Sequence, residues 1–387
     1  MNRLLVLLVC LVAAFAQDDP ARLRERAASL VAMGKYADAE PLLTRALAAQ
    51  EQAGNSEDPS LLPFIADLAA LDRAQGRNAD AEKLYQRSLA IRTKVSSADS
   101  IDLIPDLKLL GSLYAAMNRI TDAEKQYLRA VSLRINAKGT WDLDLAKDCT
   151  ELASFYISQK RYAVAEPNLR RAIEIIQTKL GPEDPSLVPV LDSLATVFIE
   201  QKNFPPAEAP LRRVVSIEEG INGPNHLNVA PYLDRLAMLF YLQKRYAEAE
   251  PLYKRSLAIW EAAMGADNPD LATTLDNLAV VYASQDKFEQ AEPLYRRSLA
   301  LREKTTIASL NNLAMVLEGE GQDAAAERQY KAAVNLADRM PVIAGADNDA
   351  LVKTLQNYAA MLHRLKREAE AKRLDARIKL LSKGDKQ

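Results

Sequence analysis

Residue types able to do catalytic chemistry are scarce in this chain. Its 387 residues include 2 histidines and 2 cysteines. No HExxH zinc motif, no G-x-S-x-G nucleophile motif and no glycine-rich phosphate loop occurs. Catalysis by carboxylates alone stays open, although no particular pair of the 52 Asp and Glu stands out. We therefore predict no enzymatic activity, no catalytic or metal site and no cofactor.

A charged pattern recurs along the chain instead. The dipeptide Ala-Glu returns every 42 residues, and an arginine follows each of its glutamates by five positions. The seven copies of the dipeptide lie at 39–40, 81–82, 123–124, 165–166, 207–208, 249–250 and 291–292. This regularity indicates a repeat protein, in which each repeat contacts its neighbours.

Within one repeat the apolar positions have helical spacing. Between residues 270 and 304, one apolar stripe is followed by a polar turn at 285–287 and then by a second stripe. Two antiparallel helices, which we call A and B, explain this pattern. We predict an all-α fold, an alpha-alpha superhelix of about nine such pairs forming a single solenoid from 17 to 387. Its 42-residue repeats extend to about 305, a compressed repeat covers 306–340, and a C-terminal repeat with a capping helix covers 349–382.

Residues that favour helix starts occur in register. A hydrogen-bonding side chain precedes each helix A, and prolines follow three residues later in four copies. We expect the caps at Ser60, Asp102, Asp144, Ser186, Asn228 and Asp270. The basic last helix fits an exposed solenoid end, although a nucleic-acid patch is the alternative.

The scarce reactive residues also fall into the repeat. His226 and His363 are three repeats apart and cannot share a metal ion or a proton relay. Cys149 occupies a position that is leucine in three other copies, so we predict a small core side chain. The repeated Glu and Arg, for example Glu250 and Arg255, suggest a structural bridge or common descent, with ligand binding as the alternative.

The first 16 residues read as a separate segment. Arg3 precedes the apolar run 4–13, and small residues stand at the two positions that a signal peptidase reads. We predict a signal peptide, 1–16, and hence a periplasmic or secreted protein without a membrane span after cleavage. An uncleaved anchor, or a lipoprotein modified at Cys10, is the alternative. With 50 basic and 52 acidic residues, the charge gives no reason to expect nucleic acid as a partner.

The repeat resembles the tetratricopeptide repeat, with its small or apolar residues at 275, 278, 279, 282, 291, 295 and 298. The 42-residue period and the strings AEPLYKRSLAI (249–259) and LGPEDPSL (180–187) are similar to the kinesin light chain subclass. That resemblance implies a solenoid whose concave groove, lined by helix A, binds peptides. The chain differs in its apparent signal peptide and in having no long N-terminal coiled coil, so a motor role does not follow.

The resemblance also implies three inward-facing positions on each helix A. Relatives that hold a terminal carboxylate use Lys and Arg there, but only Lys108 and Arg235 fit here, so we expect no such clamp. An acidic row with asparagines and apolar residues favours an extended peptide with basic and apolar side chains. A solvated groove without a ligand is the alternative. The predicted peptide-binding residues are Asp192, Thr196, Asp234, Arg235, Met238, Asp276, Asn277, Val280, Asn311, Asn312 and Met315.

The leading functional reading is thus an exported adaptor that binds a protein or peptide. Two alternatives are a self-assembling structural solenoid that forms homo-oligomers and, if the N-terminal signal is misread, an intracellular cargo adaptor. An enzyme or enzyme subunit is disfavoured by the missing catalytic motifs.

Overall fold

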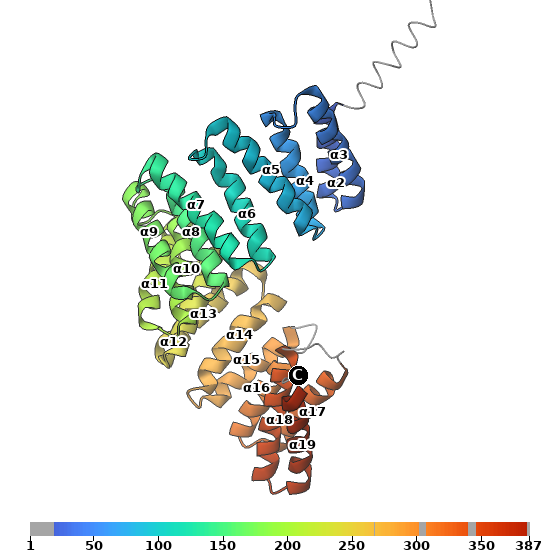
Figure 1. Ribbon diagram of the computed structural model, residues 1–387. Coiled ribbons are helices and arrows are strands. Elements are labelled where there is room, and N and C mark those ends of the chain that lie inside the picture. Colours follow the sequence, from blue (N-terminus) through green and yellow to red (C-terminus); the bar gives the residue numbers. More distant parts are fainter. Residues whose placement is uncertain (1–18, 267, 302–306, 340–345, 385–387) are drawn as a thin grey trace, which may run out of the picture. The chain divides into compact units, whose positions relative to one another are not determined.

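The computed structural model describes residues 19–266, 268–301, 307–339 and 346–384. These residues form 18 α-helices and no strand, which confirms the all-α prediction (Figure 1). The predicted signal peptide lies outside the described ranges. None of the helices in those ranges combines the length and apolarity needed to cross a membrane.

The chain forms two compact units that divide after Pro182. In unit 1, consecutive helices pack as pairs, with helix A named first in each pair. The pairs are α2 (Pro20–Ala32) with α3 (Tyr36–Ala53), α4 (Leu62–Ala74) with α5 (Asn78–Ser96), α6 (Ile104–Ala116) with α7 (Ile120–Lys138), and α8 (Leu143–Ser158) with α9 (Tyr162–Leu180).

Unit 2 repeats the arrangement and includes the compressed repeat. Its pairs are α10 (Leu187–Glu200) with α11 (Glu208–Asn222), α12 (Ala230–Leu242) with α13 (Tyr246–Met264), α14 (Ala272–Ala283) with α15 (Phe288–Leu301), α16 (Ile307–Gly319) with α17 (Asp323–Arg339), and α18 (Ala346–Arg364) with α19 (Glu368–Gly384).

In five of the six repeats with a predicted cap, the capping side chain lies two residues earlier than predicted; in the sixth, where Asp144 was predicted, α8 begins after Asp142 without a side-chain cap. A short 3-10 turn precedes the α-helix in several repeats, for example Pro59–Leu61 before α4. The side chain that caps this turn belongs to the preceding loop residue: Asp58 accepts from the amide of Ser60 at 2.8 Å. Ser100, Asp184, His226 and Asn268 do the same in their repeats. Because the 3-10 turn extends the helix at its N-terminus, the first backbone amides without an intrahelical partner lie earlier in the chain. The side chain that caps them therefore lies earlier as well.

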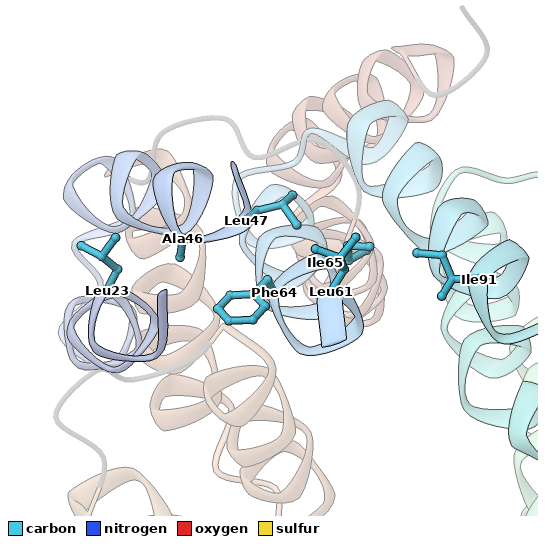
Figure 2. Packing of buried hydrophobic residues seen from close by; sticks show 7 residues of the cluster. All are labelled: Leu23, Ala46, Leu47, Leu61, Phe64, Ile65 and Ile91. Atoms are coloured by element: carbon cyan, nitrogen blue, oxygen red, sulfur yellow. The ribbon is translucent and has the colours of Figure 1, made fainter. Parts of the chain in front are cut away.

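Within each unit, a helix pair buries its apolar faces against the next pair. In the cluster of Figure 2, side chains from α2, α3, α4 and α5 meet, and Ile65 is fully buried among them. The other members are Leu23, Ala46, Leu47, Leu61, Phe64 and Ile91. Because one pair cannot cover its own apolar face, the core of unit 1 is shared between successive repeats.

The repeated glutamate bridges successive helix pairs. In five of the seven copies, and at Glu327 of the compressed repeat, the carboxylate pairs with an arginine or lysine at the turn between the next two helices, as Glu124 does with Arg161 at 2.7 Å. A tyrosine hydroxyl of the next helix A also donates to it in several copies, and Tyr156 does so to Glu124 at 2.8 Å. The pairs are Glu40–Arg77, Glu82–Arg119, Glu124–Arg161, Glu208–Arg245, Glu250–Lys287 and Glu327–Arg367. We call this set the glutamate ladder.

The repeated arginine has a different partner. Arg87 donates to the carbonyl oxygen of Ser56 at 2.8 Å, and Arg129 donates to that of Ala98 at 3.1 Å. Both carbonyls lie in the loop before helix A of the same repeat, so the arginine secures that loop to helix B. The prediction of a structural role is confirmed for both residues, although the glutamate and the arginine serve separate bridges.

Candidate functional site

All eleven predicted peptide-binding residues lie in unit 2, on its helix-A elements. They occupy three positions that recur on α10, α12, α14 and α16. The second position follows the first by one residue and the third follows it by four, so all three lie on one side of each helix. We call this surface the helix-A face. It consists of Asp192, Thr196, Asp234, Arg235, Met238, Asp276, Asn277, Val280, Asn311, Asn312 and Met315, and α18 continues it with Asn357.

The first carboxylate of the predicted acidic row is paired within the chain. Asp192 Oδ1 lies 2.8 Å from Arg235 Nε on the next helix A. Arg235 also donates to the hydroxyl of Thr196 at 2.7 Å, and that hydroxyl donates to the carbonyl of Asp192 at 2.9 Å. Burial raises the pKa of Asp192, and the charge of Arg235 opposes this shift. The ion pair offsets the charge at this end of the face.

The other two carboxylates connect successive helices A. Thr274 of α14 donates to Asp234 of α12 at 3.0 Å, and Ser309 of α16 donates to Asp276 of α14 at 3.4 Å. Burial raises the pKa of Asp234, while hydrogen bonds from Ser256, Thr274 and Trp260 lower it. The row is therefore part of the packing between repeats as well as a feature of the face.

Asparagine amides gather where α16 meets α18. Asn311 is 3% exposed, and its Oδ1 accepts from Asn357 Nδ2 at 3.0 Å. The same Asn357 nitrogen lies 3.2 Å from the sulfur of Met315. Asn312, next to Asn311 on the chain, is half-buried and faces the same surface.

Apolar side chains lie one turn further along these helices. Met238 and Met315 are 38% and 45% exposed, and Val280 between them is half-buried. Flexible, polarizable methionines adapt to varied apolar partners. The helix-A face of unit 2 thus carries amides beside an apolar strip.

Unit 1 contains two hollows at the equivalent positions. One, of about 570 Å³, lies between α2 and α4 and is lined mainly by small and apolar side chains, including Ala28, Ala70 and Ala74. The other, of about 730 Å³, is lined by Lys108 and Glu151 of helices A. Lys108 and Glu151 are paired with each other across it.

The second hollow contains two arginines that the sequence reasoning missed. Arg92 and Arg134 reach it from helices B α5 and α7, whereas only helix A had been considered. Each pairs at 2.8 Å with a buried aspartate of the next helix A, Asp106 and Asp148 respectively. The signal was present in the sequence, because both arginines and both aspartates recur at the 42-residue period.

The surroundings of Cys149, His226 and His363 indicate structural roles. Cys149 is buried, as predicted, and burial raises its thiol pKa to about 11. The imidazole of His226 caps a helical turn. His363 contacts Glu368 and Asp375 at 3.0 and 3.2 Å, and the hydrogen bond with Asp375 raises its pKa most. Among the described residues, no group of three or more His, Cys, Asp and Glu could hold a metal ion.

Several solved structures are similar to this one at low sequence identity, and the first two below, with TM-scores above 0.5, share its fold. The apo form of RapI is 16% identical, with a TM-score of 0.59, over 94% of this chain and 98% of that one. The C-terminal part of a TPR repeat-containing protein from Cytophaga hutchinsonii is 16% identical, with a TM-score of 0.53, over 75% and 98%. BtubC (BKLC) from P. vanneervenii is 22% identical, with a TM-score of 0.49, over 60% and 91%. No curated protein matches the sequence.

Family models give a direct assignment. A tetratricopeptide repeat model matches residues 61–136, 148–220, 211–262 and 228–304. A second model of the same description matches residues 306–338, in the compressed repeat. The matches cover most of the chain and agree with the observed helix pairs. The chain belongs to the tetratricopeptide repeat family.

Proposed function

We propose that this chain is an exported adaptor that holds an extended segment of a partner protein along the helix-A face of unit 2. Tetratricopeptide repeats form scaffolds for protein interaction. To this general role we add where the partner binds, that the bound segment is extended, and that the chain is exported. We call the bound segment the guest.

One observation carries the location. Asn277, Asn312 and Asn357 occupy the same register position on α14, α16 and α18, and each is half-buried on the helix-A face. A primary amide offers both a donor and an acceptor, which is what a peptide group presents in an extended chain. Three such amides, one per repeat, favour a guest held by its backbone.

The side chains beside the amides suggest the chemistry of the guest. Met238, Val280 and Met315 form an apolar strip able to accept apolar side chains. Asp234 and Asp276 add negative charge, whereas Arg235 offsets that of Asp192. We therefore propose a segment with apolar anchors and a secondary preference for Lys or Arg.

Removing two amides, each with one hydrogen bond to the partner, should weaken this interaction by about fivefold to a hundredfold. A net hydrogen bond contributes about 0.5–1.5 kcal/mol, and about 1.4 kcal/mol corresponds to a tenfold change in affinity. The chain with Asn277→Ala and Asn312→Ala is titrated by calorimetry with a peptide selected on the native chain from a random displayed library.

The matched control is Gln290→Ala, which removes an exposed amide from helix B α15. It should leave affinity unchanged. Equal affinity for the double variant and the native chain, with both folded by circular dichroism, would contradict the amide role. Exchanging Asp192, Asp234 and Asp276 for Asn tests the charge preference separately, because it should weaken binding and flatten its salt dependence.

Export is proposed from the first 16 residues alone. If the leader is a signal peptide, expression in a secreting host yields a mature chain that begins at Gln17, as read by N-terminal sequencing. A chain that retains Met1 in the envelope fraction would contradict cleavage and favour an anchored or intracellular protein.

A further inference from the structure

Each helix A of unit 2 is joined to the next by a polar side-chain contact on or beside the helix-A face. Every contact starts from the first of the three face positions and ends on a side chain of the following helix A. From α10 to α18 the contacts are Asp192–Arg235, Asp234–Thr274, Asp276–Ser309 and Asn311–Asn357, at 2.8, 3.0, 3.4 and 3.0 Å. Successive helices A are therefore held against one another along the whole face.

These contacts fix the interval at which the face repeats. The axes of helices in direct contact lie about 8–10 Å apart. Because the three face positions recur on every helix A, equivalent side chains return at about that distance along unit 2. Met238, Val280 and Met315 form one such series on α12, α14 and α16, and the asparagines of α14, α16 and α18 form a second.

A guest that makes the same contact with each repeat must match this interval. In a β-strand, side chains on one side return every two residues, or about 6.6–6.8 Å, and four residues span about 13 Å. Neither distance fits. In a polyproline II helix, three residues complete one turn and rise about 9 Å, so every third side chain points the same way at the required spacing. This backbone also has no internal hydrogen bonds, which leaves its peptide groups available to the asparagine amides.

The negative charges of the face return at the same interval. Asp234 on α12 and Asp276 on α14 occupy equivalent positions, each four residues before an apolar residue of the strip. The hydroxyls of Thr274 and Ser309 donate to these carboxylates but bring no positive charge. A Lys or Arg beside an apolar side chain of the guest complements both repeats.

We propose that the guest binds as a polyproline II segment with an apolar side chain at every third residue and with Lys or Arg next to these anchors. The inference rests on the proposed function, because it concerns the same face. The anchors contact Met238, Val280 and Met315, one in each repeat, and the asparagine amides hold the backbone beside them. A guest in β conformation would lose this register after one repeat.

Two synthetic peptides test the period. Both have blocked ends and equal numbers of Lys, Leu and Pro, but one has leucine at every third residue and the other at every second. Calorimetry on the native chain should show that the first peptide binds about tenfold more tightly, because the second buries at least one leucine fewer. Equal affinity, tighter binding of the second peptide, or no binding of either would overturn the proposal.

The middle repeat connects the period to the structure. Val280→Ala should weaken binding of the first peptide about threefold to tenfold. In this variant, replacing the middle leucine of the peptide by alanine should cost less affinity than it does on the native chain. Ile221→Ala, which truncates a side chain 51% exposed on helix B α11, is the matched control and should leave affinity unchanged. Independent effects of Val280→Ala and of the leucine exchange would contradict the register.

The bound conformation is measured on the peptide selected from the displayed library. Backbone couplings of the isotope-labelled peptide in the complex should give φ angles of about −75°, whereas a β-strand has φ of about −120° to −140°. A bound peptide with β-strand angles would overturn this inference and leave the proposed function standing. Failure of the selected peptide and of both synthetic peptides to bind would contradict the proposed function itself.

Discussion

Replacing Arg92 by alanine is expected to destabilise the chain by about 3 kcal/mol, near the lower end of the range for a broken buried ion pair. Asp106 is 4% exposed, its Oδ2 lies 2.8 Å from Arg92 Nε, and the hydroxyl of Ser88 donates to its Oδ1 at 2.9 Å. Burial raises the pKa of Asp106, and Arg92 opposes that shift. Without the arginine, a buried carboxyl must lose its charge or stay poorly compensated. Urea unfolding measures the effect.

The chain supplies its own control for this prediction. Two repeats downstream, the positions of Ser88, Arg92 and Asp106 are occupied by three buried apolar residues, Ala172, Ile176 and Val190. The triple exchange Ser88→Ala, Arg92→Ile and Asp106→Val should leave stability within about 1 kcal/mol of the native chain, or increase it, as for other buried ion pairs replaced by apolar groups. A triple variant as unstable as Arg92→Ala would show that the polar network itself stabilises this repeat.

Replacing Ile65 by alanine should cost about 2–5 kcal/mol, because it opens a cavity in a fully buried cluster shared by four helices (Figure 2). In a linear array each repeat contacts only its neighbours. The loss of amide-exchange protection should therefore concentrate in α2 to α5 and decline towards α9, as measured by mass spectrometry.

Leu128→Ala is the matched surface change for Ile65→Ala. Leu128 is 44% exposed on helix B α7, and its removal should alter stability by less than about 0.5 kcal/mol. Uniform loss of protection across unit 1 in Ile65→Ala would contradict the neighbour-by-neighbour account of its stability.

The fold could be predicted from the sequence because the same apolar pattern recurs in successive repeats. One repeat with two apolar stripes is ambiguous, but seven copies at 42 residues specify which positions are buried, and Cys149 could be placed in the core simply because other copies have leucine there. The exact starts of the helices were harder to predict from the sequence. Five caps were predicted two residues late, because a 3-10 turn before the α-helix leaves no mark in the apolar period.

The polar contacts between repeats could be predicted only in part. The period shows that Asp192, Asp234 and Asp276 are aligned, but it does not show that Arg235, Thr274 and Ser309 meet them from the next helix. Such contacts depend on side-chain conformations across two helices. Arg92 and Arg134 were missed for a related reason, since helix B was assigned wholly to packing although its long side chains reach the helix-A side.

The most direct test of the account is a photo-crosslinking measurement on the helix-A face. A benzophenone amino acid replaces Met315, which is 45% exposed on that face, or Lys331, which is exposed on helix B α17. The library-selected peptide is then added and irradiated. We expect crosslinking at position 315 that unlabelled peptide competes away, and only background at position 331. Equal crosslinking at both positions, or crosslinking at position 331 alone, would contradict it.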